Sequence, residues 1–366
     1  MAAGHVAASP GTVARDGAVA GAAGRTSGGL LIAGAVVLVL GVVVVSAMVG
    51  PAHLDVQGVV RALVDRLPLV RVDQTLDAGQ ASILWQIRLP RIALAVIVGA
   101  ALSGAGAAYQ GAFRNPLADP YLLGAAAGAA LGAAVVIAYG AGLRDVAGTT
   151  AVPFAAFAGA MGGVVMTWTL GRSVGGRSAG TLILAGVAVA SFLTSLSTYV
   201  MQRNVETIRE VYSFILGRLA THGWDEVQLI LPYVVPSLVV VLLHARLLDV
   251  MSVGDAEASS LGVRPGRVRG VVVAAATLAT AAAVAVSGLI GFIGIIVPHL
   301  VRLLVGPSHR LVLPLTMLGG AAFLTAADVV ARTLDSPAEI PIGVVTAFFG
   351  APFFVMVLRA SRRSLS

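Results

Sequence analysis

The sequence predicts an all-α integral membrane protein. Hydrophobic residues make up 58% of its 366 residues and charged residues only 11%, whereas soluble domains average about 25% charged residues. The apolar runs are about twenty residues long, which suits membrane-spanning helices. Strands of a membrane barrel would alternate apolar and polar residues instead. Because the bilayer core offers no water to backbone groups, continuous apolar runs of this kind must be helical.

The clearest pair of spans lies between Arg88 and Gly128. The sequence Arg88-Leu89-Pro90-Arg91 precedes an apolar run, and a Pro-bounded polar turn from Arg114 to Pro120 leads into the next run. We interpret this segment as a transmembrane helical hairpin. In all, we predict ten spans, at residues 30–49, 91–112, 122–141, 151–170, 179–201, 227–244, 268–286, 290–304, 311–331 and 342–358.

The remaining segments are assigned by composition. Residues 1–28 are rich in Ala, Gly and Ser and are predicted to form a disordered cytoplasmic tail, so the transmembrane domain covers residues 29–366. Residues 53–82 are predicted to be a polar, irregular connection with one amphipathic turn near residues 59–67. A short amphipathic piece is expected at residues 205–216.

Ten spans place both termini on one side of the membrane. Assigning that side to the cytoplasm puts most helix-end arginines inside, as the positive-inside rule requires. Arg61, Arg66, Arg71, Arg88 and Arg91 fall on the outer side and are exceptions. The arginines are scattered over helix ends with little aromatic interleaving, so the net charge of +7 does not indicate a nucleic-acid partner.

The sequence contains no enzyme motif of the HExxH or GxSxG type. Cys is absent, which excludes a thiolate metal site and a lipid-modified Cys. Lys is absent as well, and a phosphate-binding P-loop requires it. We therefore expect no catalytic residue, no metal site and no cofactor bound by this chain. If the function of this protein depends on ATP, ATP-Mg must bind to another subunit.

Asp328 is the clearest acidic residue inside a predicted span. It lies four residues before Arg332, a spacing that favours an ion pair on one helix face. An acidic residue in a span can also carry protons in an ion-coupled transporter. We favour the ion pair, and the proton relay stays open.

The connection over residues 247–267 is predicted to contain a short helix. Ser252 and Asp255 are three residues apart, as in a capping box, and the helix would then run from Asp255 to Leu261 and stop at Gly262. A helix in a cytoplasmic loop could dock on a soluble partner or could be an ordinary surface turn. Its position outside the spans leaves both interpretations open.

Arg88, Arg91 and Arg332 are predicted to lie at the outer ends of helices. They could anchor the helices by reaching to the membrane interface. Three exposed cations would equally suit a partner that presents carboxylates. Spacing alone does not decide between these interpretations.

A set of ordered motifs resembles one family over nearly the whole chain from Leu30 onward. The chain resembles the FecCD-type permeases of ABC importers, which carry vitamin B12, iron-siderophores and haem. The matching runs lie at residues 88–91, 99–104, 115–120, 184–187, 288–302, 339–344 and 350–354, including Pro298-His299 and Glu339-Ile340-Pro341.

The resemblance implies the type II ABC importer permease fold of ten helices. It also implies a second permease copy (the same chain or a close paralogue), two cytoplasmic ABC ATPases, an extracytoplasmic binding protein, and a bacterial cytoplasmic membrane with its lipid. Three site assignments follow from it: Arg88, Arg91 and Arg332 would contact acidic residues of the binding protein; Asn115 and Leu117 would form the cytoplasmic gate; and Asp255, Ala256, Glu257, Ala258, Leu261 and Gly262 would couple to the ATPase.

The sequence thus predicts the permease subunit of an ATP-driven importer that works by alternating access. We expect a metal chelate as substrate, with ferric siderophore first and cobalamin or haem as alternatives. A different class, a proton-coupled secondary transporter using Asp328, remains an alternative. A third alternative is a membrane assembly subunit without transport.

Overall fold

The computed structural model describes residues 11–50, 55–65, 76–142, 150–173 and 179–363. Within these ranges, seven helices are long and apolar enough to cross a membrane, and three further apolar helices are shorter. Together they fall on the ten ranges predicted from the sequence. The long spans belong to α1 (Gly11–Met48), the continuous helix Ala78–Phe113, α7 (Ala151–Ser173), α8 (Ala179–Arg203), α10 (Asp225–Leu243), α13 (Pro265–Ser287) and α15 (His309–Thr333). The shorter apolar helices are α5 (Ala125–Tyr139), α14 (Ile293–Val305) and the part Ile342–Met356 of α16 (Ile342–Arg363).

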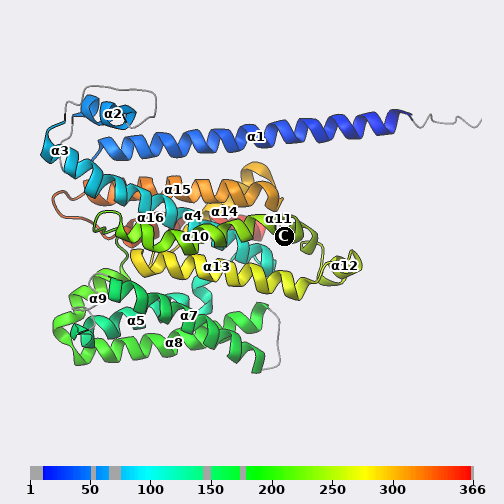
Figure 1. The fold of residues 1–366 in the computed structure, drawn as a ribbon. Coiled ribbons are helices and arrows are strands. Elements are labelled where there is room, and N and C mark those ends of the chain that lie inside the picture. Colours follow the sequence, from blue (N-terminus) through cyan, green and yellow to red (C-terminus); the bar gives the residue numbers. More distant parts are fainter. Residues whose placement is uncertain (1–10, 51–54, 66–75, 143–149, 174–178, 364–366) are drawn as a thin grey trace, which may run out of the picture.

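The short elements connect these spans at the two ends of the molecule. At the end shown on the left of Figure 1 lie α2, α3 and α9, and at the right-hand end lies α12. The start of α1 lies at the same end as α12. The short elements are α2 (Val56–Asp65), α3 (Ala78–Ser82), the π-helix η1 (Ile83–Arg88), the 3₁₀ turns η2 (Pro120–Leu123) and η4 (Val205–Thr207), α9 (Ile208–Ile215), α11 (Ala245–Met251) and α12 (Asp255–Ser260).

Helix α4 (Leu89–Phe113) lies at the centre of the fold and is buried along most of its length. It packs against α10, α13, α14 and α15. Small residues allow this close packing: a Cβ atom at Gly106 would collide with the carbonyl of Gly294 on α14, and one at Gly128 of α5 would collide with the carbonyl of Gly159 on α7. Small residues at such crossings are typical of helix packing in membranes, where lipid provides no hydrophobic drive between helices.

Three sequence-based expectations need correction. Residues 11–28 belong to helix α1, whereas a disordered tail was expected there; residues 1–10 lie outside the described residues. In the connection before α4, α2 confirms the amphipathic turn predicted near residues 59–67, whereas α3 makes the last part of the connection helical rather than irregular. The third span begins at Ala125 and not at residue 122, because Gly124 adopts a positive φ of 82° that ends the preceding 3₁₀ turn.

Candidate functional site

A charged cluster occupies the end of the protein opposite α12, which the predicted topology assigns to the outer side of the membrane and which we call the outer end. Asp328 on α15 is fully buried and lies between two guanidinium groups. Arg91 pairs with it at 2.9 Å, and Arg332 pairs with it at 3.3 Å from one helical turn away. Arg91 also bonds Glu339 at 2.9 Å. The predicted i,i+4 ion pair is confirmed, and Arg91 from α4 is a second partner that sequence spacing did not indicate.

The same cluster holds the end of α1. Arg88 donates to the carbonyl of Ala47 at 2.7 Å, and Arg332 donates to both the carbonyl and the hydroxyl of Ser46, at 2.7 and 2.6 Å. The last carbonyls of a helix have no partner within the helix and carry partial negative charge. Two arginines from other helices therefore satisfy this helix end and fix its position.

This arrangement corrects the expectation that the three arginines are exposed. Arg88 and Arg332 are only 4% and 3% exposed, because they bond groups inside the protein. Arg91 is the most accessible of the three, with a side chain 17% exposed, and it lines an outer cavity of about 230 Å³. A contact of these arginines with a binding protein stays a proposal.

Sequence reasoning missed one outer cation. Arg218, which follows α9 after Leu216 and Gly217, is exposed and lines the same cavity as Arg91 and Glu339. Within the described residues no carboxylate forms an ion pair with it. Its position at the end of the amphipathic 205–216 piece was the available signal, since that piece joins two spans on the outer side.

At the opposite end, α12 forms the short helix predicted within residues 247–267, which we call the coupling segment after its expected contact with the ATPase. It spans Asp255–Ser260, and Gly262 follows with a φ of 82° that terminates it. Ser252 does not cap this helix: its hydroxyl bonds the carbonyl of Asp249, and Gly254 occupies the N-cap position with a φ of 140° that favours glycine.

The side chains of α12 divide between the protein and the solvent. Ala258 is fully buried and seats the helix on its neighbours. Ala256 and Glu257 are exposed, and Leu261 just after the helix is 69% exposed. A large exposed apolar side chain beside a carboxylate is available for contact with another protein.

Asp255 joins this segment to the turn after α4. Its carboxylate pairs with Arg269 of α13 at 3.0 Å and with Arg114 at 3.1 Å. Arg269 also donates to the carbonyl of Ala112, the second-last residue of α4. A displacement of α12 would therefore pull directly on the end of α4 and on the turn that follows.

That turn contains both predicted gate residues. Asn115 accepts a hydrogen bond from the backbone N–H of Leu117 at 2.9 Å, which closes a tight turn directly after Arg114. Both side chains are half-buried. Asn115 lines a cavity of about 650 Å³ together with Arg302 and His309. The structure thus brings the gate turn and the coupling segment together, and it leaves the outer cluster at the far end of α4.

Comparisons with known proteins identify the chain. The model of the FecCD transport family matches residues 37–360. The cobalamin import system permease of Halobacterium salinarum is 43% identical over 76% of this chain and 73% of its own length. The iron(3+)-hydroxamate import system permease of Bacillus subtilis is 35% identical over 93% of this chain and 86% of its own.

The fold agrees with these matches. An inward-facing structure of a metal-chelate type ABC transporter superposes with a TM-score of 0.77 at 30% identity, covering 90% of this chain and 99% of that one. Its fold is the one predicted from the sequence. The chain therefore belongs to the FecCD transport family and is an ABC transporter permease subunit.

Proposed function

We propose that this chain, paired with a second permease copy, forms the membrane passage of an importer that moves a metal chelate into the cytoplasm by alternating access. ATP-Mg binds and is hydrolysed on two partner ATPases, and a binding protein delivers the chelate at the outer end. The observation that carries this proposal is the carboxylate of Asp255, which bonds the gate turn and α13 from the segment exposed at the cytoplasmic end.

In this mechanism, the conformational change of the ATPases is transmitted to the permease through α12. The ATPase contacts Glu257 and Leu261, which are exposed, while the buried Ala258 keeps α12 attached to the permease. When the ATPases close, α12 moves with them. The pairs of Asp255 with Arg114 and Arg269 transmit this movement to the turn that holds Asn115 and Leu117, and the gate changes its state.

The passage itself is assigned to the exposed face of α8. This face carries large apolar side chains such as Leu184 and Phe192. Its hydroxyl groups bond inside the helix: Ser191, Ser195 and Thr198 each donate to the carbonyl four residues earlier at 2.9 Å. A passage lined by hydroxyl groups that already donate hydrogen bonds to the backbone binds the chelate weakly. Selection of the chelate is therefore assigned to the binding protein.

We propose ferric siderophore as the substrate, with cobalamin and haem as the alternatives. The relative named for iron(3+)-hydroxamate import aligns with most of this chain, and the relative named for cobalamin import has the higher identity over a shorter stretch. Titrating the cognate binding protein with ferric hydroxamate, cobalamin and haem separates the three.

The outer cluster argues against a proton-coupled transporter. Asp328 is held by two guanidinium groups, and a carboxylate fixed between two cations is a poor proton carrier. Vesicles that hold the permease without ATPase should show no uptake under a proton gradient. Gradient-driven uptake that Asp328→Asn abolishes would establish the alternative class instead.

Reconstituted permease, ATPase and binding protein provide the direct test. Leu261→Ala and Glu257→Ala should uncouple ATP hydrolysis from chelate uptake, because they remove the proposed contact with the ATPase. Val253→Ala is the matched control, since Val253 lies in the same connection and is 65% exposed but is outside the proposed contact. Unchanged coupling in the first two variants would disprove the proposed docking.

A further inference from the structure

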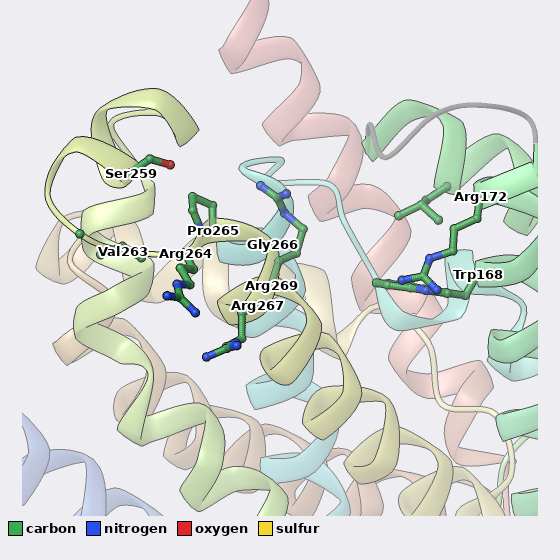
Figure 2. Close-up of a pocket in the computed structure, with 11 residues that line it drawn as sticks. Trp168, Arg172, Ser259, Val263, Arg264, Pro265, Gly266, Arg267 and Arg269 are labelled. Atoms are coloured by element: carbon green, nitrogen blue, oxygen red, sulfur yellow. The ribbon is translucent and has the colours of Figure 1, made fainter.

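A basic cavity lies between the cytoplasmic ends of α7 and α13. It has a volume of about 840 Å³. In Figure 2, Arg264, Arg267 and Arg269 from the start of α13 lie on one side, and Trp168 and Arg172 from the end of α7 lie on the other. Four arginines therefore line one cavity at the cytoplasmic end of two membrane spans.

The positive charge in this cavity is largely uncompensated. Arg269 is engaged by Asp255 and by the carbonyl of Ala112. Arg264, Arg267 and Arg172 are exposed, and no carboxylate in the described part of the chain pairs with any of them. Arg172 lies over the ring of Trp168, with its guanidinium carbon 5.5 Å from the ring centroid. Three guanidinium groups remain available to an anion.

The cavity continues into an apolar groove between the same two helices. This groove has a volume of about 230 Å³ and is lined by Val164, Gly270, Val273 and Ala274, among others. Trp168 borders both spaces, so the groove adjoins the basic cavity. Because α7 and α13 are membrane spans, the groove leads from the aqueous boundary toward the hydrocarbon region.

We propose that this composite site binds an anionic phospholipid of the inner leaflet. Its phosphate lies among Arg172, Arg264 and Arg267, and an acyl chain occupies the groove below Trp168. Basic pockets between spans at the cytoplasmic surface attract anionic headgroups, and guanidinium groups match the geometry of phosphate oxygens. The apolar groove favours a lipid over an acidic segment of a soluble partner, which has no chain to place between two spans.

Native mass spectrometry of the full-length permease tests this site. The protein is reconstituted in nanodiscs of equal parts phosphatidylglycerol and phosphatidylcholine, released in detergent, and scored for retained lipid. We expect selective retention of phosphatidylglycerol. Arg264→Gln and Arg267→Gln should each lower it about fivefold, the effect of one surface arginine on anionic lipid binding. Arg246→Gln is the control, because Arg246 is exposed at the same end but outside the cavity.

Filling the groove tests the acyl chain separately from the charge. A Cβ at Gly270 would meet no atom within 4 Å, so Gly270→Leu adds volume to the groove without a clash in the backbone. It should reduce retained phosphatidylglycerol while leaving the arginines unchanged. Ala274→Leu, which lines the same groove, serves if the first variant folds poorly.

Three results would overturn the proposal. Equal retention of the two lipids by the native protein would remove the headgroup preference. Normal retention in Gly270→Leu or Ala274→Leu, with displacement by inorganic phosphate, would indicate a phosphate site without an acyl chain. Arginine variants that lose the ATPase from the assembled complex but keep their phosphatidylglycerol would assign the cavity to ATPase docking.

Discussion

The arginines at the two ends of this permease differ in their burial and in their interaction partners. At the outer end, Arg88, Arg91 and Arg332 meet Asp328, Glu339 and the last carbonyls of α1, and most of these groups are buried. At the end assigned to the cytoplasm, Arg269 pairs with Asp255, and the other three arginines of the basic cavity pair with no carboxylate in the described part of the chain. A buried charge must find its partners inside the protein, whereas an exposed one stays available to other molecules.

This difference explains two of the exceptions to the positive-inside rule, Arg88 and Arg91. At the outer end, Arg91 pairs with Asp328 and Glu339, and Arg88 donates to the carbonyl of Ala47, so the fold itself supplies partners for both. Among the described arginines that obey the rule, Arg114, Arg269 and Arg310 pair with carboxylates. Among the same described arginines, the exposed ones without a carboxylate partner are Arg172, Arg246, Arg264 and Arg267. Helix-end arginines should therefore be classified as buried or exposed before a role is assigned to them.

The largest effect is expected from Asp328→Asn. The substitution removes the carboxylate that compensates Arg91 and Arg332 and leaves their charges buried without it, which should lower the free energy of unfolding by about 3–5 kcal/mol. Thermal unfolding in detergent would measure the loss. Asp335→Asn is the matched control, because Asp335 is exposed at the same end and should change stability by less than about 0.5 kcal/mol. Similar stability of the two variants would contradict the conclusion that the outer arginines depend on a carboxylate inside the protein.

A smaller loss is expected from Ser46→Ala. The hydroxyl of Ser46 is buried and bonds Arg332 at 2.6 Å, and hydrogen bonds to charged groups contribute about 1.5–3 kcal/mol. Ser197→Ala is a control of the same residue type, since Ser197 is 3% exposed and its hydroxyl has no hydrogen-bond partner in the described structure. Equal unfolding temperatures for the two variants would show that Arg332 does not depend on the end of α1.

Asp255→Asn should change stability less but function more. The Asp255 side chain is 45% exposed, so its ion pairs contribute at most about 1 kcal/mol. Loss of the carboxylate should nevertheless reduce chelate uptake per ATP hydrolysed severalfold, because α12 would lose its connection to the gate turn. Proteoliposomes with ATPase and binding protein would measure both rates. Full coupling in this variant would contradict the proposed route from α12 to Asn115.

The sequence predicted the spans well because each one is a local property. A run of about twenty apolar residues is readable without knowing its neighbours, and the spacing of Asp328 and Arg332 is readable in the same way. The pair of Arg91 with Asp328 joins residues 237 positions apart and depends on how α4 packs against α15. No periodicity within either helix could indicate it.

The candidate site was therefore predicted in its parts but not in its connections. The short helix after Gly254 and its stop at Gly262 follow from local residue types. The expected cap at Ser252 was wrong, because Gly254 takes the N-cap position and the hydroxyl of Ser252 bonds the preceding turn. The link from Asp255 to Arg114 spans two separate segments, and the burial of Arg88 required the position of α1, so both needed the assembled fold.

Salt provides the smallest and most discriminating test of the two ends. Raising ionic strength from 0.1 M to 1 M shortens the Debye length from about 10 Å to about 3 Å, which screens exposed pairs far more than buried ones. A double-mutant cycle on Arg114 and Asp255, whose side chains are 41% and 45% exposed, should give a coupling free energy of at most about 1 kcal/mol at low salt, and most of it should disappear at high salt. The same cycle on Arg91 and Asp328 should give a larger value that salt barely changes, because the carboxylate is inaccessible to ions. If salt weakened both pairs alike, the outer cluster would be open to solvent, and its arginines would be as available to partners as those of the cytoplasmic cavity.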